Sequence, residues 1–150
     1  LQAPLPAPRF GGRGCDVLVV EDSAIARKFM QLRLQRLGYR VHLARSGEEA
    51  LVMADALPLT AIFLDVQLGG TGALDGFEVC QRLRQRPATL DETEPAIVMV
   101  TGSKEAADRV RGSLAGCDAY LTKPLAEAEL LQTLRRVDPG FDPAGDTVLG

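Results

Sequence analysis

Five short apolar segments alternate with longer segments of helical pattern, and this alternation constrains the fold more than any other feature of the sequence. The apolar segments predict strands over 16–20, 40–44, 61–64, 96–100 and 119–121. The segments between and after them predict helices over about 23–37, 48–56, 76–86, 104–114 and 125–137. Strands separated by helices pair in parallel, because each helix carries the chain back across the sheet. Since the first, third and fourth strands are almost wholly apolar, we predict a doubly wound α/β fold with both sheet faces covered.

The first helix has clear start and stop signals. Ser23 is a suitable N-cap residue, and Gly38 stands where helices commonly end. Within the helix Ile25, Phe29 and Leu32 follow the i, i+4, i+7 spacing of one helical face. We therefore expect these three side chains to be buried against the sheet.

Composition excludes several classes of function. The charged residues are 17 basic and 20 acidic, giving a net charge of −3, and the chain has no Trp and only 2 Tyr and 5 Phe. Direct nucleic-acid binding normally requires a basic surface or stacking aromatics, so we do not expect it here. The apolar runs are too short to cross a membrane. Cys15, Cys80 and Cys117 are odd in number and widely spaced, which is typical of reduced thiols, so we expect a cytoplasmic protein.

Polar side chains follow four of the predicted strands. Because the carboxyl ends of parallel strands meet at one edge of the sheet, where ligands of such folds bind, these side chains should lie together. A polar residue at the end of a single strand is unremarkable, but the combination predicts a site. The residues concerned are Glu21 and Asp22, Asp65, Thr101, and Thr122 with Lys123.

This combination of groups favours phosphoryl chemistry. Three neighbouring carboxylates repel one another unless a cation lies between them, and oxygen ligands favour Mg²⁺ or Mn²⁺. Lys123 and Thr101 are suited to donate to phosphoryl oxygens, and a carboxylate can itself be phosphorylated. Asp65 is the best candidate nucleophile because it ends a central strand alone, whereas Glu21 and Asp22 are better placed as metal ligands.

The chain resembles the receiver domains of two-component response regulators. The matching segments are VLVVEDS at 17–23, FLD at 63–65, LDGFE at 74–78, IVMVTG at 97–102 and AYLTKP at 119–124. The resemblance covers residues 15–137 and implies a flavodoxin-like fold with strand order 2-1-3-4-5. We interpret residues 1–14 as a linker or vector-derived segment and 138–150 as a linker or disordered tail. The chain is expected to be a stand-alone regulator or, preferably, a receiver cut from a hybrid kinase or a multidomain protein.

The resemblance also implies a role for each matching position. Asp65 is the phosphoacceptor, and Lys123 pairs with it and then with the phosphoryl oxygens. The Lys123–Pro124 peptide bond is expected to be cis. Thr101 is the switch hydroxyl, and Tyr120 is the aromatic residue that moves with it. The implied ligands of Mg²⁺ (or Mn²⁺) are Glu21, Asp22, Asp65 and the backbone carbonyl of Gln67.

These roles describe a signalling domain rather than a classical enzyme. A sensor histidine kinase or phosphotransfer protein would donate the phosphoryl group. The face formed by the fourth and fifth strands and the last helix would then control a partner protein or a tethered output domain. Formation of a homodimer on phosphorylation is a further possibility. Two rivals remain: a pseudo-receiver that only binds proteins, and an aspartate-nucleophile phosphatase. The phosphatase needs a second carboxylate two residues after the nucleophile, where this chain has Gln67.

One segment departs from the family pattern. Between Gln67 and Asp75 the chain has a glycine-rich insertion, Gly69 to Leu74, where similar domains take a shorter path. A tolerated surface loop and a regulatory loop are equally good interpretations. Either way, the insertion bears on metal affinity and on the lifetime of the phosphate, because Gln67 lies beside it.

Overall fold

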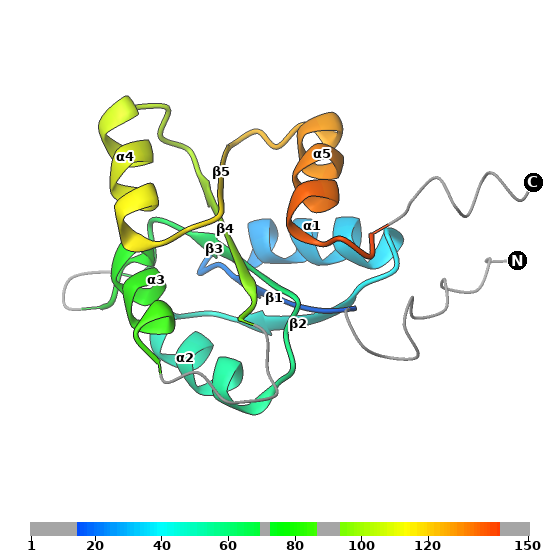
Figure 1. Ribbon diagram of the computed structural model, residues 1–150, viewed down its shortest axis with the longest axis horizontal. Helices are drawn as coiled ribbons and strands as arrows, with labels where there is room; N and C mark the ends of the chain where they lie inside the picture. Colours follow the sequence, from blue (N-terminus) through cyan, green and yellow to red (C-terminus); the bar gives the residue numbers. More distant parts are fainter. Residues whose placement is uncertain (1–14, 70–72, 87–93, 142–150) are drawn as a thin grey trace, which may run out of the picture.

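The computed structural model describes residues 15–69, 73–86 and 94–141, and it contains a single parallel sheet of five strands (Figure 1). The strand order is β2-β1-β3-β4-β5, so the predicted fold class and strand order are confirmed. The middle of the insertion (70–72), residues 87–93 and both tails lie outside the described residues. The elements are β1 (Asp16–Val20), α1 (Ala24–Arg36), β2 (Arg40–Ala44), α2 (Gly47–Ala56), β3 (Ala61–Asp65), α3 (Gly76–Arg84), β4 (Ala96–Thr101), α4 (Ala106–Ala115), β5 (Ala119–Thr122) and α5 (Glu127–Val137).

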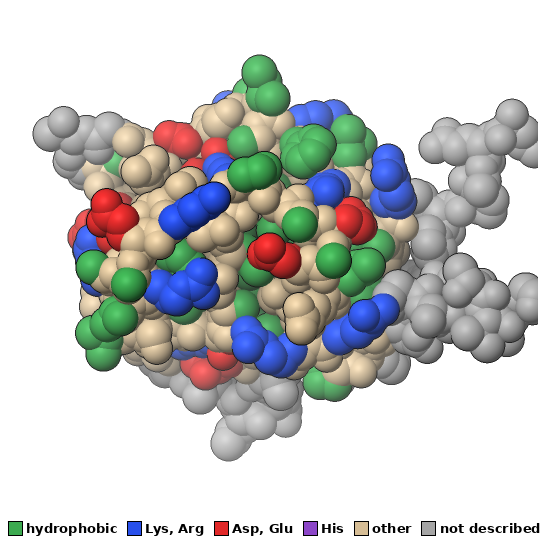
Figure 2. Space-filling view, turned by 90° about the horizontal axis from the view of Figure 1, so that it is seen from above, with side chains coloured by type: hydrophobic (Ala, Val, Ile, Leu, Met, Phe, Trp, Pro, Cys, Tyr) green, Lys and Arg blue, Asp and Glu red, His purple; other side chains and the backbone are tan. Residues whose placement is uncertain are grey.

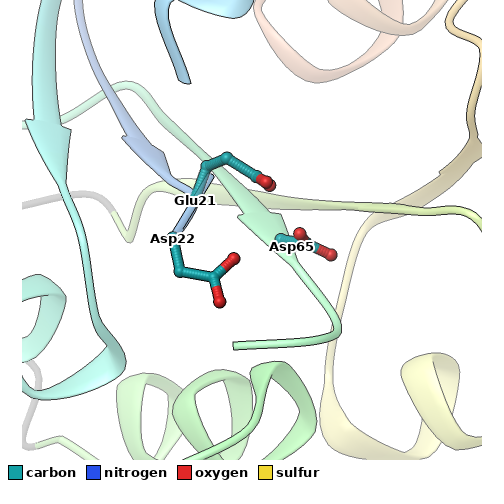
Figure 3. A group of neighbouring side chains, drawn as sticks. All are labelled: Glu21, Asp22 and Asp65. Atoms are coloured by element: carbon teal, nitrogen blue, oxygen red, sulfur yellow. The ribbon is translucent and has the colours of Figure 1, made fainter. Parts of the chain in front are cut away.

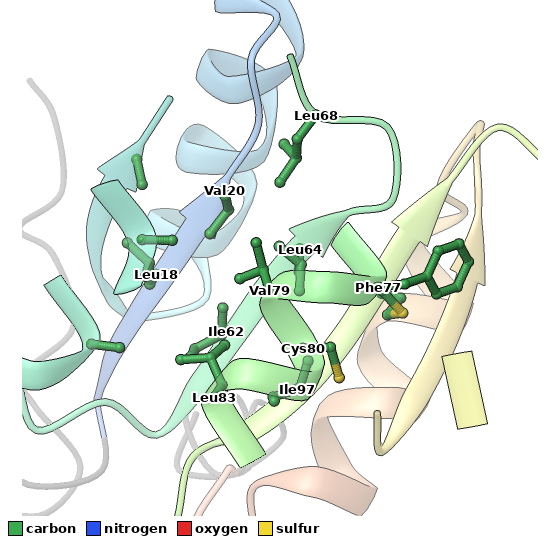
Figure 4. Close-up of a cluster of buried hydrophobic side chains, with 14 of the residues drawn as sticks. Leu18, Val20, Ile62, Leu64, Leu68, Phe77, Val79, Cys80, Leu83 and Ile97 are labelled. Carbon is green, nitrogen blue, oxygen red and sulfur yellow. The ribbon is translucent and has the colours of Figure 1, made fainter. Parts of the chain in front are cut away.

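The sheet separates two apolar clusters. Alternate side chains of a strand point to opposite faces, so Leu18 and Val20 pack with α2, α3 and α4, whereas Val17 and Val19 pack with α1 and α5. Figure 4 shows the first of these clusters, with Val79 of α3 lying over the central strands. Burial on both faces explains why the central strands are almost continuously apolar.

The strand register brings the polar residues to one edge. Val20 is level with Leu64 across β1 and β3, and Asp65 is level with Val100 across β3 and β4. Thr101 is the last residue of β4, one position further along. Acidic and hydroxyl side chains therefore emerge together at the carboxyl edge of the sheet, as the sequence predicted.

The predicted buried face of α1 is wrong. Ile25, Phe29 and Leu32 are 85%, 57% and 48% exposed, and the buried residues of this helix are Met30 and Leu34. The helix carries apolar residues on two faces. The i, i+4, i+7 spacing identifies residues that share a face, but it does not determine which face packs against the sheet. An exposed apolar strip therefore remains on the surface next to the carboxyl edge.

Helix ends follow the sequence signals where such signals exist. The Ser23 hydroxyl accepts a hydrogen bond from the Ala26 amide, and Gly38 adopts a positive φ of 98° just after the helix, as predicted. In contrast α4 and α5 each begin two residues later than predicted, after Glu105 and Ala126, whose side chains make no capping hydrogen bond. Without a capping side chain, the sequence does not mark the first residue of a helix.

The packed structure continues beyond α5. Asp138 and Phe141 are both buried, and the Tyr39 hydroxyl donates a hydrogen bond of 2.6 Å to the Asp138 carboxylate. The Tyr39 and Phe141 rings stack with their centres 5.8 Å apart. The folded region thus reaches Phe141, past the boundary expected at Val137. Across the described parts of the chain no helix is both long enough and apolar enough to span a bilayer.

Candidate functional site

Three carboxylates meet at the carboxyl edge of the sheet. Glu21 and Asp22 follow β1, and Asp65 ends β3, so the two central strands supply the whole group (Figure 3). One carboxylate oxygen from each residue lies within 4.8 Å of the others. Glu21 and Asp65 are buried, whereas Asp22 is exposed at the rim. The spacing is suitable for one divalent cation with oxygen ligands.

Lys123 supplies the positive charge that faces these carboxylates. Its Nζ lies 3.4 Å from Glu21 Oε2 and 3.4 Å from Asp65 Oδ2. Its backbone amide donates to the Thr101 carbonyl, which fixes the start of the segment after β5, and the Lys123–Pro124 bond is cis as expected. A single ammonium group shared by two buried carboxylates leaves the cluster with an excess of negative charge.

The pKa of Glu21 is raised in this cluster. Burial is the main cause, followed by the neighbouring Asp65 carboxylate, and Lys123 offsets only part of the effect. Together they raise the pKa of Glu21 from 4.5 to about 7. The protein thus holds one of its carboxylates where ionisation is costly, which is typical of functional sites.

The backbone around Asp65 holds its side chain in place. The Gln67 amide donates a 3.0 Å hydrogen bond to Asp65 Oδ1, and the Gly76 amide donates to the Val66 carbonyl at 2.8 Å. A Cβ on Gly76 would collide with the Asp65 carbonyl oxygen and would lie 2.7 Å from Val66 Cα. Glycine is therefore required where α3 begins against the end of β3, which gives a physical reason for the Asp75–Gly76 pair.

Thr101 and Tyr120 lie on the neighbouring strands. Thr101 is fully buried, and its hydroxyl oxygen accepts a hydrogen bond from the Ser103 amide at 3.2 Å. The Tyr120 ring lies beneath the Arg109 guanidinium, 5.0 Å from the ring centre. Its hydroxyl oxygen is buried close to the Thr101 side chain but makes no hydrogen bond of normal geometry within the described residues, and burial raises the pKa of the phenol. A buried hydroxyl without a partner is uncommon and marks a position that can form a new bond.

Two further contacts at this edge were not predicted. The Gly69 amide donates a 3.0 Å hydrogen bond to Asp22 Oδ2, and Gly69 has a positive φ of 66°. The Arg27 guanidinium donates to the Glu21 carbonyl at 2.8 Å. The glycine-rich composition of 69–72 was the available signal for the first contact, because a left-handed backbone is what glycine permits. The insertion therefore begins with a direct bond to the acidic cluster.

A sequence model of the response regulator receiver domain matches residues 17–135 of the chain. The chain belongs to this family. As expected for a member, its receiver fold carries the acidic cluster, Lys123 and Thr101 along one edge of the sheet.

Relatives of known sequence and structure agree with this assignment. The receiver domain is 37% identical over 126 residues to the probable transcriptional regulator ycf27 of Porphyra purpurea, covering 81% of this chain and 48% of that protein. The chain thus spans about half the length of the curated relatives it matches. A putative response regulator from Chloroflexus aurantiacus has a TM-score of 0.72 at 34% identity, covering 81% of this chain and 95% of the other.

A third relative is described with its metal. The receiver domain of sensor histidine kinase PA1611 from Pseudomonas aeruginosa has a TM-score of 0.70 at 29% identity, covering 84% of this chain and 98% of the other. That structure is described as having a magnesium ion coordinated in its active-site cleft.

Proposed function

We propose that this receiver domain accepts a phosphoryl group on Asp65 from a phosphohistidine of a histidine kinase or phosphotransfer protein. The observation that carries the proposal is the position of the Asp65 carboxylate: it is buried and lies between Lys123, at 3.4 Å, and the acidic pair after β1. A nucleophilic carboxylate needs a nearby cation to approach an anionic phosphoryl group, and this edge of the sheet offers one.

The acidic cluster is suited to Mg²⁺ or Mn²⁺. Glu21, Asp22 and Asp65 would hold the ion, together with the backbone carbonyl of Gln67. Their donor set consists of oxygen atoms only, which favours these ions over zinc. When bound, the ion neutralises charge on the phosphoryl oxygens, and the magnesium described for the PA1611 receiver domain supports this assignment.

In the transfer step an oxygen of the Asp65 carboxylate attacks phosphorus while the bond from phosphorus to the donor imidazole breaks. The imidazole nitrogen keeps the electron pair of that bond and takes up a proton. Lys123 Nζ, 3.4 Å from Asp65 Oδ2, would pair with a phosphoryl oxygen, and the Gln67 amide would keep Asp65 Oδ1 in place. Catalysis here consists of positioning and charge neutralisation.

Phosphorylation would then change the neighbouring strands. The phosphoryl group carries nearly two negative charges and three acceptor oxygens, in place of the single charge of the Asp65 carboxylate. Thr101 would turn its hydroxyl from the Ser103 amide towards the phosphoryl group. The Tyr120 hydroxyl would then form a hydrogen bond. The face formed by β4, β5 and α5 would thereby signal to a partner protein or a tethered output domain, with a homodimer as one form of that response.

The pseudo-receiver is the second candidate, and one observation favours it. The Gly69 amide donates to Asp22 Oδ2, so one of the two oxygens of this carboxylate is already engaged by the insertion. If this bond excludes the cation, the domain keeps the fold and binds partners without being phosphorylated.

Intact mass spectrometry distinguishes the two candidates. The chain is incubated with acetyl phosphate, with and without Mg²⁺, alongside Asp65→Asn and, as a matched control, Asp55→Asn at an exposed carboxylate of α2. We expect the mass of one added phosphoryl group, dependent on Mg²⁺, in the wild type and in Asp55→Asn but not in Asp65→Asn. A folded wild-type protein that gains no phosphoryl group, next to a receiver that does, would establish the pseudo-receiver.

A further inference from the structure

An open pocket lies beside the acidic cluster, on the face of the sheet that α1 and α5 cover. Its volume is about 220 Å³. Aliphatic and aromatic side chains of α1, of the three central strands and of the segment after β5 form most of its wall, and the charged residues that line it are Glu21, Asp65 and Lys123. The apolar part of the lining includes Ala26, Phe29, Met30, Phe63, Val100 and Leu125.

Two arginines of α1 hold the walls of this pocket in position. Arg33 donates a 2.6 Å hydrogen bond to the Leu125 carbonyl and pairs with Glu127 at 3.3 Å, so it links α1 to the start of α5. Arg27 bonds the Glu21 carbonyl at the other end of the pocket. Because these contacts fix the helix relative to the segment after β5, the pocket exists before anything binds in it, which lowers the cost of binding.

The exposed ring of Phe29 belongs to the same feature. Phe29 lines the pocket and is 57% exposed, with the Arg33 guanidinium 5.0 Å from its ring centre. On the surface seen from above, apolar side chains are interspersed with charged ones (Figure 2). An aromatic side chain at the mouth of an apolar pocket gives a bound ring a surface on which to stack.

Size and chemistry together indicate the class of ligand. A dry apolar cavity of about 150 Å³ holds benzene, so by proportion 220 Å³ holds roughly nine non-hydrogen atoms. The apolar wall favours an uncharged ring system. Where the wall becomes polar, the carboxylates of Glu21 and Asp65 offer hydrogen-bond acceptors, which an N–H or O–H group of the ligand would satisfy.

We propose that this pocket binds a small uncharged aromatic molecule of about the size of indole, with its N–H or O–H directed to the carboxylates. The binding site itself does not depend on the proposed function. Its consequence does: since Glu21 and Asp65 of the acidic cluster and the neighbouring Lys123 all line the pocket, an occupied pocket would slow phosphorylation of Asp65. By reciprocity, Mg²⁺ and phosphorylation would weaken the binding of the aromatic molecule.

Calorimetric titration with indole tests the proposal in the absence of any phosphodonor. Two variants change the pocket without touching the acidic cluster: Ala26→Leu fills it, and Phe29→Ala removes the exposed ring. The matched controls on α2 are Ala56→Leu and Val52→Ala, both at exposed positions. Thermal unfolding of each variant establishes that it folds.

We expect saturable binding of one indole per chain, weakened at least about tenfold by both pocket variants and unchanged in both controls. Absence of saturable binding, or equal binding by Ala26→Leu and wild type, overturns the proposal. A third outcome is that indole does not bind but Ala26→Leu blocks phosphotransfer from a phosphohistidine protein. The pocket would then receive a side chain of that partner, and this result also overturns the proposal. If indole binds and Asp65 takes no phosphate, the site stands and only the proposed function fails.

Discussion

The two ends of the sheet each bury acidic side chains, but these side chains differ in the number of side-chain partners that they have. At the amino end, Asp16 is 4% exposed and its Oδ1 lies 3.0 Å from His42 Nε2 and 3.3 Å from an Arg40 guanidinium nitrogen. At the carboxyl end, Glu21 and Asp65 share Lys123 at 3.4 Å. One carboxylate thus has two side-chain nitrogen partners at the first end, whereas two buried carboxylates share one side-chain nitrogen partner, Lys123 Nζ, at the second.

This difference is the one expected between a structural site and the candidate functional site proposed above. A buried carboxylate with its partners within the protein is satisfied in the folded state and stabilises it. A cluster with too few partners costs folding free energy, which a cation or a phosphoryl group can offset when it binds. We therefore expect the amino end to stabilise the sheet, and the carboxyl end to become more stable when a cation or a phosphoryl group binds, as the proposed function requires.

The largest effect is expected from Gly76→Ala, which tests whether the backbone holds the carboxyl end together. The added Cβ would collide with the Asp65 carbonyl oxygen and lie 2.7 Å from Val66 Cα, and backbone atoms cannot move aside as a side chain can. We expect a loss of about 3 kcal/mol in the free energy of unfolding, measured by urea denaturation. A loss below 1 kcal/mol would show that α3 shifts without cost, and would remove the reason given for this glycine.

Asp16→Asn tests the satisfied end. The variant keeps the size of the side chain but removes the charge that faces Arg40, and it weakens the contact with His42. We expect the free energy of unfolding to fall by about 2 kcal/mol at pH 8, because a charged hydrogen bond is lost in a buried position. An unchanged stability would mean that the amino end is no better satisfied than the carboxyl end.

Glu21→Gln should act in the opposite direction. The pKa of Glu21 in the folded protein, about 7, lies above its ordinary value of 4.5, so the folded state binds more protons between these pH values. Stability from this group is therefore full below pH 4.5, falls as the pH rises, and is lost above pH 7. Without metal, we expect the variant to be more stable than wild type by roughly 1–2 kcal/mol at pH 8 and equal to it at pH 4. A destabilised variant at pH 8 would contradict the account.

The smallest effect is expected from Gly102→Ala, directly after Thr101. A Cβ at this position would have no heavy atom within 4 Å, and the φ of Gly102 is not positive. The alanine should raise the free energy of unfolding by about 0.4–1 kcal/mol, by restricting the unfolded chain. Gly116→Ala is the control, because its φ of 104° and its contact with Arg84 predict destabilisation. A loss of stability in Gly102→Ala would show that the loop needs its glycine.

Much of the fold was predictable because the strands consist almost entirely of apolar residues. All five strand positions were correct to within one residue, since buried parallel strands have almost no polar residues until they end. The same property predicted the candidate site: Asp65 and Thr101 are the first polar residues of long apolar runs, and the register brings them to the same edge of the sheet. The roles given to these residues stay predictions, which the experiments above test.

Other features depend on contacts that have no local signal. The orientation of α1 was predicted wrongly because apolar residues on both of its faces satisfy the helical spacing, and only the sheet decides which face is buried. The packing of Phe141 on Tyr39 joins residues far apart in the sequence. The bond from Gly69 to Asp22 likewise joins an insertion to the end of another strand.

Calorimetric titration with Mg²⁺ at pH 8 tests the difference between the two ends most directly. The account predicts one saturable site in the wild type, weakened at least about tenfold by Asp65→Asn and unaffected by Asp16→Asn, because only the carboxyl end lacks sufficient positive partners. Equal Mg²⁺ affinity in wild type and Asp65→Asn, or a loss of affinity in Asp16→Asn that matches it, would contradict the account.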